Sequence, residues 1–435
     1  MLRYWMIGLV VVVAGCRPAQ GLFAGDRVVE TQGEPLDCAA EPVADAAPAV
    51  VADAASPEPA PPVVRKAETP APVDTSTPGS KPTAAKGTND VDEIPPETQT
   101  VAALPTGPVE KQSRSVAVNG RAVSVRVLRV PLGSFKLRVG LARGRVGCTE
   151  SLKDIAQRHN AEAAINGSFF DAYSNDTVKN PYGHLATGGQ VIHIADHPAT
   201  LGYWADGTAA IGAVKYKVQG KLDGDGGWRG RWYAYGMNDY PINQTLAQLY
   251  TPRWALGDTP GDGIQVVVRN GKVVSKSAGT HAIPNDGYII YLRGKEKYLA
   301  DRFKPGQKCA YSITAESSDA DHKWAEVQEA IGCGPLLVRN GEVTMNPEAE
   351  GFRDPKILSG TGSRSAVGVT DDGYLLMATC SGVTVKQLAG IMKAVGAHDA
   401  MNLDGGASSC LYYKGSYLVS PGRNISNALL VVARE

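Results

Sequence analysis

The sequence predicts an α+β fold: a single β-rich domain of mixed sheet with a few helices, preceded by a disordered tether rich in Pro and Ala. Three observations support this prediction. Short segments of alternating apolar and polar residues recur after the first quarter of the 435-residue chain, which is typical of half-buried strands. Two-residue turn signals separate many of these segments. The 49 glycines fit many tight turns, and stretches with helical spacing are few.

The composition limits the class of partner. Lys and Arg number 44, as do Asp and Glu, so the net charge is zero with neutral histidine. No basic run is present, and binding to nucleic acid depends on cations that neutralise phosphates. We therefore expect no nucleic-acid partner. A hydrophobic content of 43% suffices for a packed core, and 16 of the 28 prolines fall in the first 110 residues. The core is therefore expected downstream of them.

Residues 1–15 have the layout of a secretory signal peptide, in which a basic residue precedes a short apolar run. The run is too short for a membrane span of about 20 residues. Its end, Val13-Ala14-Gly15-Cys16, resembles a bacterial lipobox, which implies cleavage before Cys16 and lipid attachment to it. An ordinary signal peptide with an incidental cysteine is the alternative. We expect a protein of the bacterial cell envelope, lipid-anchored to a membrane and facing the periplasm or the exterior.

Residues 16–112 are expected to be a disordered tether. Ala, Pro, Val and acidic residues dominate the segment, and no aromatic residue lies between Phe23 and Phe135. Such a segment cannot bury enough apolar area to offset its chain entropy. A spacer is therefore expected, and a partner-binding segment is the alternative. The domain itself is expected to span 113–435.

Local patterns in this domain predict its elements. Alternation predicts strands at 122–130 and 135–141. Helices are expected at 151–160, at 323–330 and after Thr384, which is spaced from Gln387 as in a capping box. Turn dipeptides with hairpin character are Asn119-Gly120, Asp206-Gly207, Asn270-Gly271, Asn340-Gly341, Asp372-Gly373 and Lys414-Gly415.

Cysteine usage fits an exported protein but leaves the pairing open. Cys16 and Cys38 precede the domain, and five cysteines lie within it: Cys148, Cys309, Cys333, Cys380 and Cys410. The odd count leaves either one free thiol or a bond to Cys38. No CxxC pair exists, which excludes a zinc ribbon.

Two segments could supply the chemistry. In 163–171 (AAINGSFFD) a short apolar strand leads into Asn-Gly, two aromatics and Asp171. In the C-terminal block, Asp404 follows a strand end and opens a glycine turn with serines behind it. Consecutive glycines let backbone N–H groups converge on an anion, and Arg364 and Arg423 could each bind phosphate oxygens. A carboxylate, a nest and arginines suggest a site for a phosphorylated substrate. A tight turn with a structural Asp is the alternative.

Weaker patterns support no metal site or cofactor. His193 and His197 have metal-like spacing but follow a strand-like segment. The loop at Asp223 lacks the acidic twelfth residue of a calcium loop, where Ala234 stands. We expect no metal ligands and no required cofactor, although calcium or magnesium could join an acidic phosphate site. Four aromatics fit either sugar stacking or core packing: Trp228, Trp232, Tyr233 and Tyr235.

Several motifs in order resemble the phosphodiester glycosidase family. They are NGSFFD, GCGPLLVRNGEV, SRSAVG, the stretch ending in AMNLDGGASS, and RNISNALLV. The resemblance extends from the first strands of the domain to the C-terminus. It implies hydrolysis of a sugar-1-phosphodiester, such as an N-acetylglucosamine-1-phosphodiester, in envelope or extracellular glycans. A non-catalytic glycan- or envelope-binding lipoprotein on the same fold is the alternative.

The resemblance also implies site residues at the matching positions. Those expected to bind substrate are Asn166, Gly167, Phe169, Gly334, Arg364, Asn402, Gly405, Gly406, Ser408, Ser409, Arg423 and Asn427. Two residues depart from the family pattern. Ala407 stands where glycine is usual, and Cys410 stands where a small or hydroxyl residue is common. A disulfide from Cys410 to Cys380 on an adjacent strand is one interpretation of the second departure.

The leaving group simplifies the expected chemistry. Glycosidases normally use two carboxyl groups, but a phosphomonoester, with its last ionisation near pH 6, leaves with little need for a proton. We expect Asp404 to act as base or nucleophile and Arg364 to neutralise the phosphate, with Asp171 as the reserve second carboxylate. Asn166 and Asn402 would bind sugar hydroxyls or orient other groups.

Overall fold

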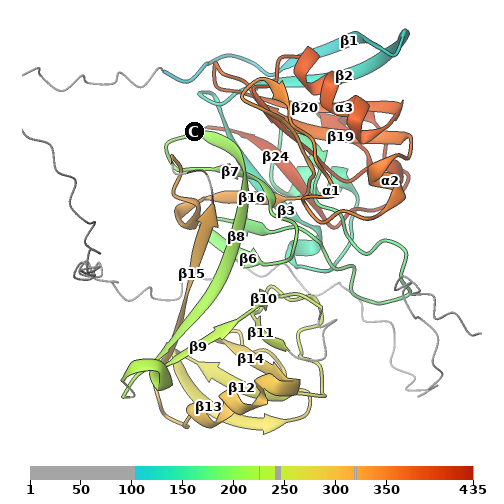
Figure 1. The fold of residues 1–435 in the computed structure, drawn as a ribbon. Helices are drawn as coiled ribbons and strands as arrows, with labels where there is room; N and C mark the ends of the chain where they lie inside the picture. The colour runs from blue at the N-terminus through green and yellow to red at the C-terminus, as the bar shows by residue number, and fades with distance from the viewer. Residues whose placement is uncertain (1–102, 225, 241–245, 318, 320, 435) are drawn as a thin grey trace, which may run out of the picture. The chain divides into compact units, whose positions relative to one another are not determined.

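The computed structural model describes residues 103–434 apart from 225, 241–245, 318 and 320. The expected signal peptide, Cys16 and nearly all of the expected tether lie outside the described residues. In the described part, four β-sheets dominate and helices are few and short (Figure 1). The α+β, β-rich prediction is confirmed. Paired strands are antiparallel except for β10 and β11, which are parallel.

Two sheets position the predicted motifs. The first has the order β1-β2-β20-β19-β21-β17-β18 and the second β23-β22-β4-β24-β3. The first comprises β1 (Glu110–Val118), β2 (Arg121–Pro131), β17 (Leu336–Arg339), β18 (Glu342–Val343), β19 (Gly362–Val369), β20 (Tyr374–Val383) and β21 (Asp399–Asn402). The second comprises β3 (Phe135–Leu141), β4 (Ala163–Asn166), β22 (Leu411–Tyr413), β23 (Ser416–Val419) and β24 (Asn427–Ala433).

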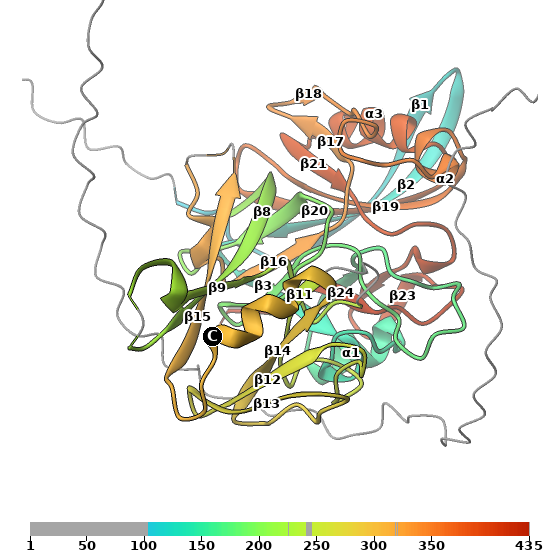
Figure 2. The same ribbon diagram turned by 60° about the horizontal axis from the view of Figure 1, so that its bottom comes forward.

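The other two sheets complete the domain. One runs β15-β8-β7-β16-β5-β6, with β9 beside β8, and the other β10-β11-β14-β12-β13. The long strands β8 and β15 run side by side (Figures 1 and 2). These strands are β5 (Leu185–Thr187), β6 (Gln190–His193), β7 (Ala199–Tyr203), β8 (Ala209–Leu222), β9 (Arg231–Ala234), β10 (Gly236–Met237), β11 (Leu246–Tyr250), β12 (Ile264–Arg269), β13 (Lys272–Ala278), β14 (Gly287–Arg293), β15 (Cys309–Ser317) and β16 (Glu329–Gly332).

The predicted strands and turns are present. Strands β2 and β3 coincide with the alternating segments, and all six turn dipeptides join consecutive strands. In four of them both residues have positive φ, as a two-residue hairpin requires to match the strand twist. Lys414 (φ 45°) shows that a non-glycine residue can occupy the first position of such a turn.

Two of the three predicted helices form. Helix α1 (Leu152–Arg158) is capped by the Ser151 side chain, and α3 (Val385–Ala394) begins with the predicted capping box of Thr384 and Gln387. A third helix, α2 (Pro355–Leu358), is one turn long. Short 3₁₀ helices are η1 (Ala142–Gly144), η2 (Gly227–Gly230), η3 (Gly294–Arg302), η4 (Trp324–Glu326) and η5 (Gly406–Ser408).

The expected helix at 323–330 is wrong. Only η4 forms there, and the segment then enters strand β16. All four residues of β16 are buried, because the strand pairs with β7 on one side and β5 on the other. Pairing inside a sheet supplies burial that an isolated turn of helix lacks, so tertiary contacts override local propensity.

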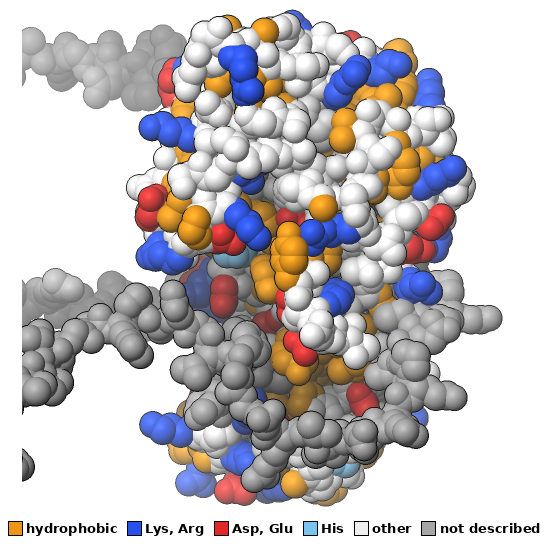
Figure 3. Space-filling view, turned by 90° about the vertical axis from the view of Figure 1, so that its right-hand side faces the viewer, with side chains coloured by type: hydrophobic (Ala, Val, Ile, Leu, Met, Phe, Trp, Pro, Cys, Tyr) orange, Lys and Arg blue, Asp and Glu red, His pale blue; other side chains and the backbone are white. Residues whose placement is uncertain are grey.

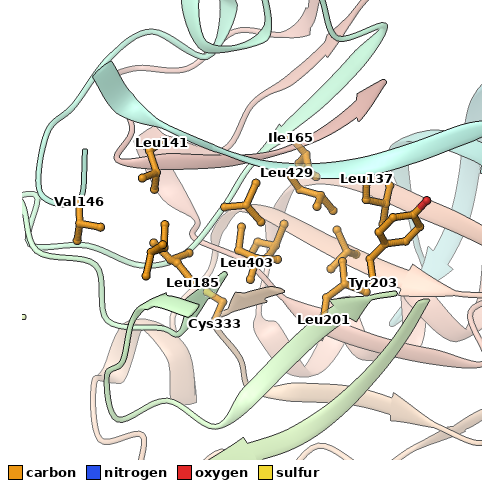
Figure 4. Close-up of a cluster of buried hydrophobic side chains, with 14 of the residues drawn as sticks. Leu137, Leu141, Val146, Ile165, Leu185, Leu201, Tyr203, Cys333, Leu403 and Leu429 are labelled. Atoms are coloured by element: carbon orange, nitrogen blue, oxygen red, sulfur yellow. The ribbon is translucent and has the colours of Figure 1, made fainter. Parts of the chain in front are cut away.

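The largest apolar cluster lies directly beneath the C-terminal motif. It includes Leu403, which Figure 4 shows among Leu185, Leu429 and Cys333. Leu403 is fully buried. The predicted catalytic carboxylate of Asp404 is therefore attached directly to a residue packed in the core.

The interpretation of Cys380 and Cys410 as a disulfide is wrong. The two side chains are buried thiols. Cys380 is on β20 in the seven-stranded sheet with β19, whereas Cys410 immediately precedes β22 in another sheet, so the strands are not paired neighbours. Burial raises the pKa of both thiols to about 12, which keeps them protonated and unreactive.

Candidate active site

The two predicted motif segments meet at Asp404. Its backbone N–H donates to Gly167 O (3.0 Å), and Asn166 Nδ2 donates to Asp404 O (2.7 Å). Asn166 ends β4, and Asn402 ends β21. Segments separated by more than 200 residues in sequence are thus joined at this point.

The Asp404 carboxylate is partly buried and close to positive charge. It accepts hydrogen bonds from Gly405 N–H (2.8 Å) and the Ser408 hydroxyl. Burial raises the pKa of Asp404 to about 6, although both hydrogen bonds, Arg423 and Arg364 act to lower that pKa. A carboxyl that titrates near the operating pH is suited to act as base or nucleophile.

The glycine turn bonds largely within itself. Gly405 N–H donates a hydrogen bond to Asp404 Oδ1. The N–H groups of Ser408 and Ser409 donate to the carbonyls of Gly405 and Gly406, respectively. These three donors therefore support the turn. Gly406 needs its positive φ of 62°, whereas Ala407 has an ordinary φ inside η5, so its departure from glycine costs no backbone strain.

Three predicted asparagines are buried and hold the backbone. Asn166 Oδ1 accepts from Ser365 Oγ (2.8 Å) and Cys410 N–H (3.0 Å). Asn402 Nδ2 donates to Gly334 O (2.8 Å), and Asn427 Oδ1 accepts from Ser168 N–H (2.9 Å). None of the three is more than 1% exposed. These hydrogen bonds join the segments around Asp404 to one another.

Gly167 occupies a position that has no room for a side chain. A Cβ there would lie 2.1 Å from Asn427 Oδ1 and 2.5 Å from Ile331 Cδ1. We expect Gly167→Ala to lower the free energy of unfolding by about 1–3 kcal/mol, because the core must shift to accept the methyl group.

Gly390→Ala is the matched control for Gly167→Ala. Gly390 is on α3, and a Cβ there meets nothing within 4 Å. The free energy of unfolding should rise by about 0.5–1 kcal/mol, since alanine favours the helix. Urea unfolding measures both variants. Equal effects of the two substitutions would contradict the packing argument.

Arg364 is buried and largely engaged by the backbone. Its Nη2 donates to Lys356 O (2.7 Å) and Gly360 O (2.6 Å), and its Nε donates to Val383 O (3.3 Å). Its Nη1 is the nitrogen turned toward Gly405. The side chain therefore ties the loop before β19 to the glycine turn, and it contributes positive charge near Asp404.

Two further cations, Arg423 and Lys356, lie at the rim of the site. The Arg423 guanidinium is 4.5 Å from the centre of the Tyr173 ring and donates to its hydroxyl (2.9 Å). The Lys356 ammonium is 4.6 Å from the same ring centre. Arg423 belongs to a motif that the sequence displays, whereas Tyr173 and Lys356 belong to no recognisable motif.

Aromatic rings line another part of the site. Phe169 makes edge contacts with His197 and Phe352, and His197 stacks on Phe352 with ring centres 4.5 Å apart. Burial lowers the pKa of His197, which favours the neutral imidazole. His197 therefore contributes to an apolar shelf with Phe169. The other histidine of the metal-like pair, His193, is fully buried with its ring nitrogens on the carbonyls of Asn238 and Pro181.

Glu350 is a carboxyl group that sequence reasoning missed. It accepts from Leu336 N–H, and a Cβ on Gly334 would lie 3.4 Å from Glu350 Oε2 and 3.3 Å from the Phe352 ring. Gly334 in turn is bonded through its N–H to Asn402 O (3.0 Å). Burial raises the pKa of Glu350 to about 7. The sequence around Glu350 gives little indication of this role. It shows only a glutamate two residues before Phe352 in a polar segment.

Asp171 lies in the loop after Phe169. Its Oδ1 accepts from Ser174 N–H (3.1 Å), and its own N–H donates to Asn180 O (2.9 Å). These contacts are local to the loop that carries Tyr173. The negative charge of Asp171 contributes to the raised pKa of Tyr182, after burial.

Three buried polar atoms around the site have no hydrogen-bond partner among the described residues. They are Ser168 Oγ, Asn402 Oδ1 and Ser409 Oγ. Buried polar groups in proteins are nearly always satisfied by protein, water or ligand. Water or a polar ligand would satisfy these atoms in the solvated protein.

Figure 3 shows one face of the molecule, on which Lys and Arg side chains lie among hydrophobic and acidic ones. Within the described residues, no group of three or more His, Cys, Asp or Glu side chains is arranged to hold a metal ion. No helix in the same residues is long and apolar enough to cross a membrane.

The four aromatics left open by the sequence divide between core and surface. Trp232 is buried in a core cluster, and Trp228 is 66% exposed. Tyr233 and Tyr235 donate their hydroxyls to the two oxygens of Glu296. None of the four is among the residues that contact Asp404.

Comparison with solved structures shows the fold. A hypothetical protein from Synechocystis matches with a TM-score of 0.65 and 24% identity, over 76% of this chain and 64% of that protein. A candidate exported protein from Burkholderia pseudomallei matches with a TM-score of 0.60 and 20% identity, over 72% of this chain and 74% of that protein. A third match is the catalytic domain of zebrafish N-acetylglucosamine-1-phosphodiester alpha-N-acetylglucosaminidase, auto-inhibited by its pro-peptide. It has a TM-score of 0.42 and 16% identity, over 77% of this chain and 85% of that chain.

Sequence comparisons address the family. The curated proteins include no significant match to the chain. Residues 262–432, which run from before β12 into β24 and include Asp404, Arg364 and Arg423, match the phosphodiester glycosidase family. The resemblance to the phosphodiester glycosidase family that the sequence motifs indicate is thereby confirmed over residues 262–432.

Proposed function

We propose that the protein hydrolyses a sugar-1-phosphodiester in envelope or extracellular glycans, and that it does so as a lipid-anchored protein of the bacterial envelope. The observation that supports this most is Asp404, a partly buried carboxylate with a pKa of about 6 beside Arg423. The family match supports a glycosidase-type activity. N-acetylglucosamine is the sugar that we would test first.

The reaction exchanges one bond to the anomeric carbon for another. The bond from that carbon to the bridging phosphate oxygen breaks, and the leaving phosphomonoester takes the electron pair. A water oxygen becomes bonded to the anomeric carbon, and its proton passes to a carboxylate or to solvent. Asp404 acts either on that water as base or on the carbon as nucleophile.

Glu350 is our choice for the second carboxyl, ahead of Asp171. Its pKa of about 7 allows it to hold a proton at a pH where Asp404 is already ionised. Two carboxyls with separated pKa values are the usual acid and base of glycoside cleavage. In Asp171, by contrast, one carboxylate oxygen accepts a hydrogen bond from Ser174 N–H within its own loop.

These two pKa values predict a bell-shaped pH profile. Activity should rise as pH passes about 6, because Asp404 must lose its proton, and fall above about 7, because Glu350 must keep its proton. Glu350→Gln should remove the falling limb and lower kcat by about 10²-fold, the low end for a general acid, since phosphate leaves readily. Asp171→Asn is the comparison, and a falling limb lost in that variant instead would reassign the acid.

The test of the proposed function is release of free sugar from an N-acetylglucosamine-1-phosphodiester by the purified full chain. Release with simultaneous formation of a phosphomonoester supports the proposal. If the folded protein were inactive on a panel of sugar phosphodiesters, the non-catalytic glycan-binding alternative would replace it. Calcium, magnesium and a chelator should be compared in the same assay, since a divalent cation is not part of the proposed mechanism.

A further inference from the structure

Tyr173, Arg423 and Lys356 form a charged cluster on the surface beside Asp404. Tyr173 is 75% exposed, although its ring contacts two cations. Holding an exposed tyrosine between two long side chains costs conformational entropy of those side chains. The cluster is joined to Asp404 electrostatically, because Arg423 lowers the pKa of that carboxyl.

The cluster carries surplus positive charge. Within the described part of the chain, neither Arg423 nor Lys356 forms an ion pair with a carboxylate. The basic side chains elsewhere on this domain often do, as in Arg158 with Glu150 (2.6 Å) and Lys393 with Glu342 (2.6 Å). Two cations at the rim of a site that form no ion pair with a carboxylate favour an anionic ligand.

Arg364 already uses most of its donors on the backbone in this arrangement. Two of its three nitrogens already donate to backbone carbonyls, and one of these bonds is to Lys356 O (2.7 Å). Arg364 therefore positions the residue whose ammonium reaches Tyr173. From the sequence, Arg364 was expected to neutralise the phosphate. Its role in positioning Lys356 was not part of that expectation.

We propose that Tyr173, Arg423 and Lys356 are the subsite that holds the substrate's phosphate, with the sugar over Phe169 and His197. This inference rests on the proposed function and extends it to the orientation of the substrate. Lys356 and Arg423 contact the anion, and Tyr173 is a positioning residue for both.

The subsite would act on the reaction as well as on binding. A phosphodiester carries one negative charge, and the phosphomonoester that leaves approaches two at neutral pH. Two cations beside the leaving oxygen therefore stabilise the products and the transition state more than the substrate, which accelerates the step. No other reactant is required.

Direct binding tests the subsite without turnover. We would titrate the full chain with glycerol 3-phosphate, a phosphomonoester, by calorimetry at pH 7.5. The unmodified protein should bind it, and Lys356→Ala and Arg423→Ala should each weaken binding about tenfold, equal to about 1.4 kcal/mol. Lys386→Ala is the matched control, because Lys386 is an exposed lysine on α3.

Two variants of Tyr173 separate positioning from general damage. Tyr173→Phe keeps the ring against both cations and should bind the phosphomonoester nearly as well as the unmodified protein. Tyr173→Ala removes the ring and should weaken binding as much as loss of one cation. No binding by the unmodified protein, or equal binding by all variants, would overturn the subsite.

Activity then distinguishes this inference from the proposed function. Lys356→Ala should lower kcat/KM about tenfold for a sugar phosphodiester and leave it unchanged for an aryl glycoside of the same sugar, which has no phosphate. An equal loss on both substrates would overturn the phosphate assignment. If the unmodified protein turned over neither substrate, the proposed function would fail, and calorimetry alone would decide the subsite.

Discussion

Asp404→Asn should reduce sugar release at least about 10³-fold while leaving the fold intact. The asparagine has the same shape, so it can still accept from Gly405 N–H, but it can act neither as base nor as nucleophile. The unmodified protein and the variant would be compared by initial rates at pH 6.5, between the two pKa values near 6 and 7.

Stability should change in the opposite direction to activity. Burial raises the pKa of Asp404 from 3.8 to about 6, so the folded state binds a proton more tightly than the unfolded chain does. The contribution of this group to stability therefore falls as pH rises from about 3.8 to 6. Above that range Asp404→Asn, which carries no charge, should be at least as stable as the unmodified protein.

The exposed carboxylate Asp371 supplies the control for Asp404→Asn. Its side chain is 89% exposed in the turn after β19, and Asp371→Asn should leave the rate unchanged. More than a tenth of the original activity in folded Asp404→Asn would show that the reaction uses another carboxyl. Glu350 and Asp171 would then be the residues to replace next.

Asn166→Ala should lower the free energy of unfolding by about 3–5 kcal/mol, because several buried polar groups lose their partner together. The side chain bonds to Ser365 Oγ, Cys410 N–H and Asp404 O, and it is fully buried. Urea unfolding followed by fluorescence would measure the loss.

Asn424→Ala is the comparison for Asn166→Ala, since Asn424 is exposed in the loop before β24. Its effect should stay within about 0.5 kcal/mol. A loss below about 1 kcal/mol for Asn166→Ala would mean that water replaces the amide. Asn166 would then contribute little to joining the two motif segments.

Much of the fold could be predicted from local patterns. The turn dipeptides, the strands β2 and β3 and the capped helices α1 and α3 depend on side-chain alternation and on hydrogen bonds between residues close in sequence. The expected helix at 323–330 failed for the converse reason. Strand β16 is stabilised by β7 and β5, whose partners cannot be identified from the segment itself.

The motif residues of the site could also be named from the sequence. Their roles could be assigned only in part. Asn166, Asn402 and Asn427 were expected at the substrate site, with Asn166 and Asn402 either binding sugar hydroxyls or orienting other groups. In the structure all three are buried and hydrogen-bonded to neighbouring segments. A pattern of residues records that a position matters. It does not tell whether the side chain meets substrate or backbone, because that depends on the direction in which the folded chain turns it.

The amino-acid sequence was sufficient for the β-rich class, the hairpins and the pairing of Asp404 with a glycine turn, since each depends on neighbours along the chain. Glu350, Tyr173 and Lys356 became candidates only in the tertiary structure. Burial raises the pKa of Glu350, and the cation contacts of Tyr173 come from groups distant in sequence, such as Arg423, which is 250 residues away. Electrostatic interactions depend on separation in space, and that separation exists only once the sheets have assembled.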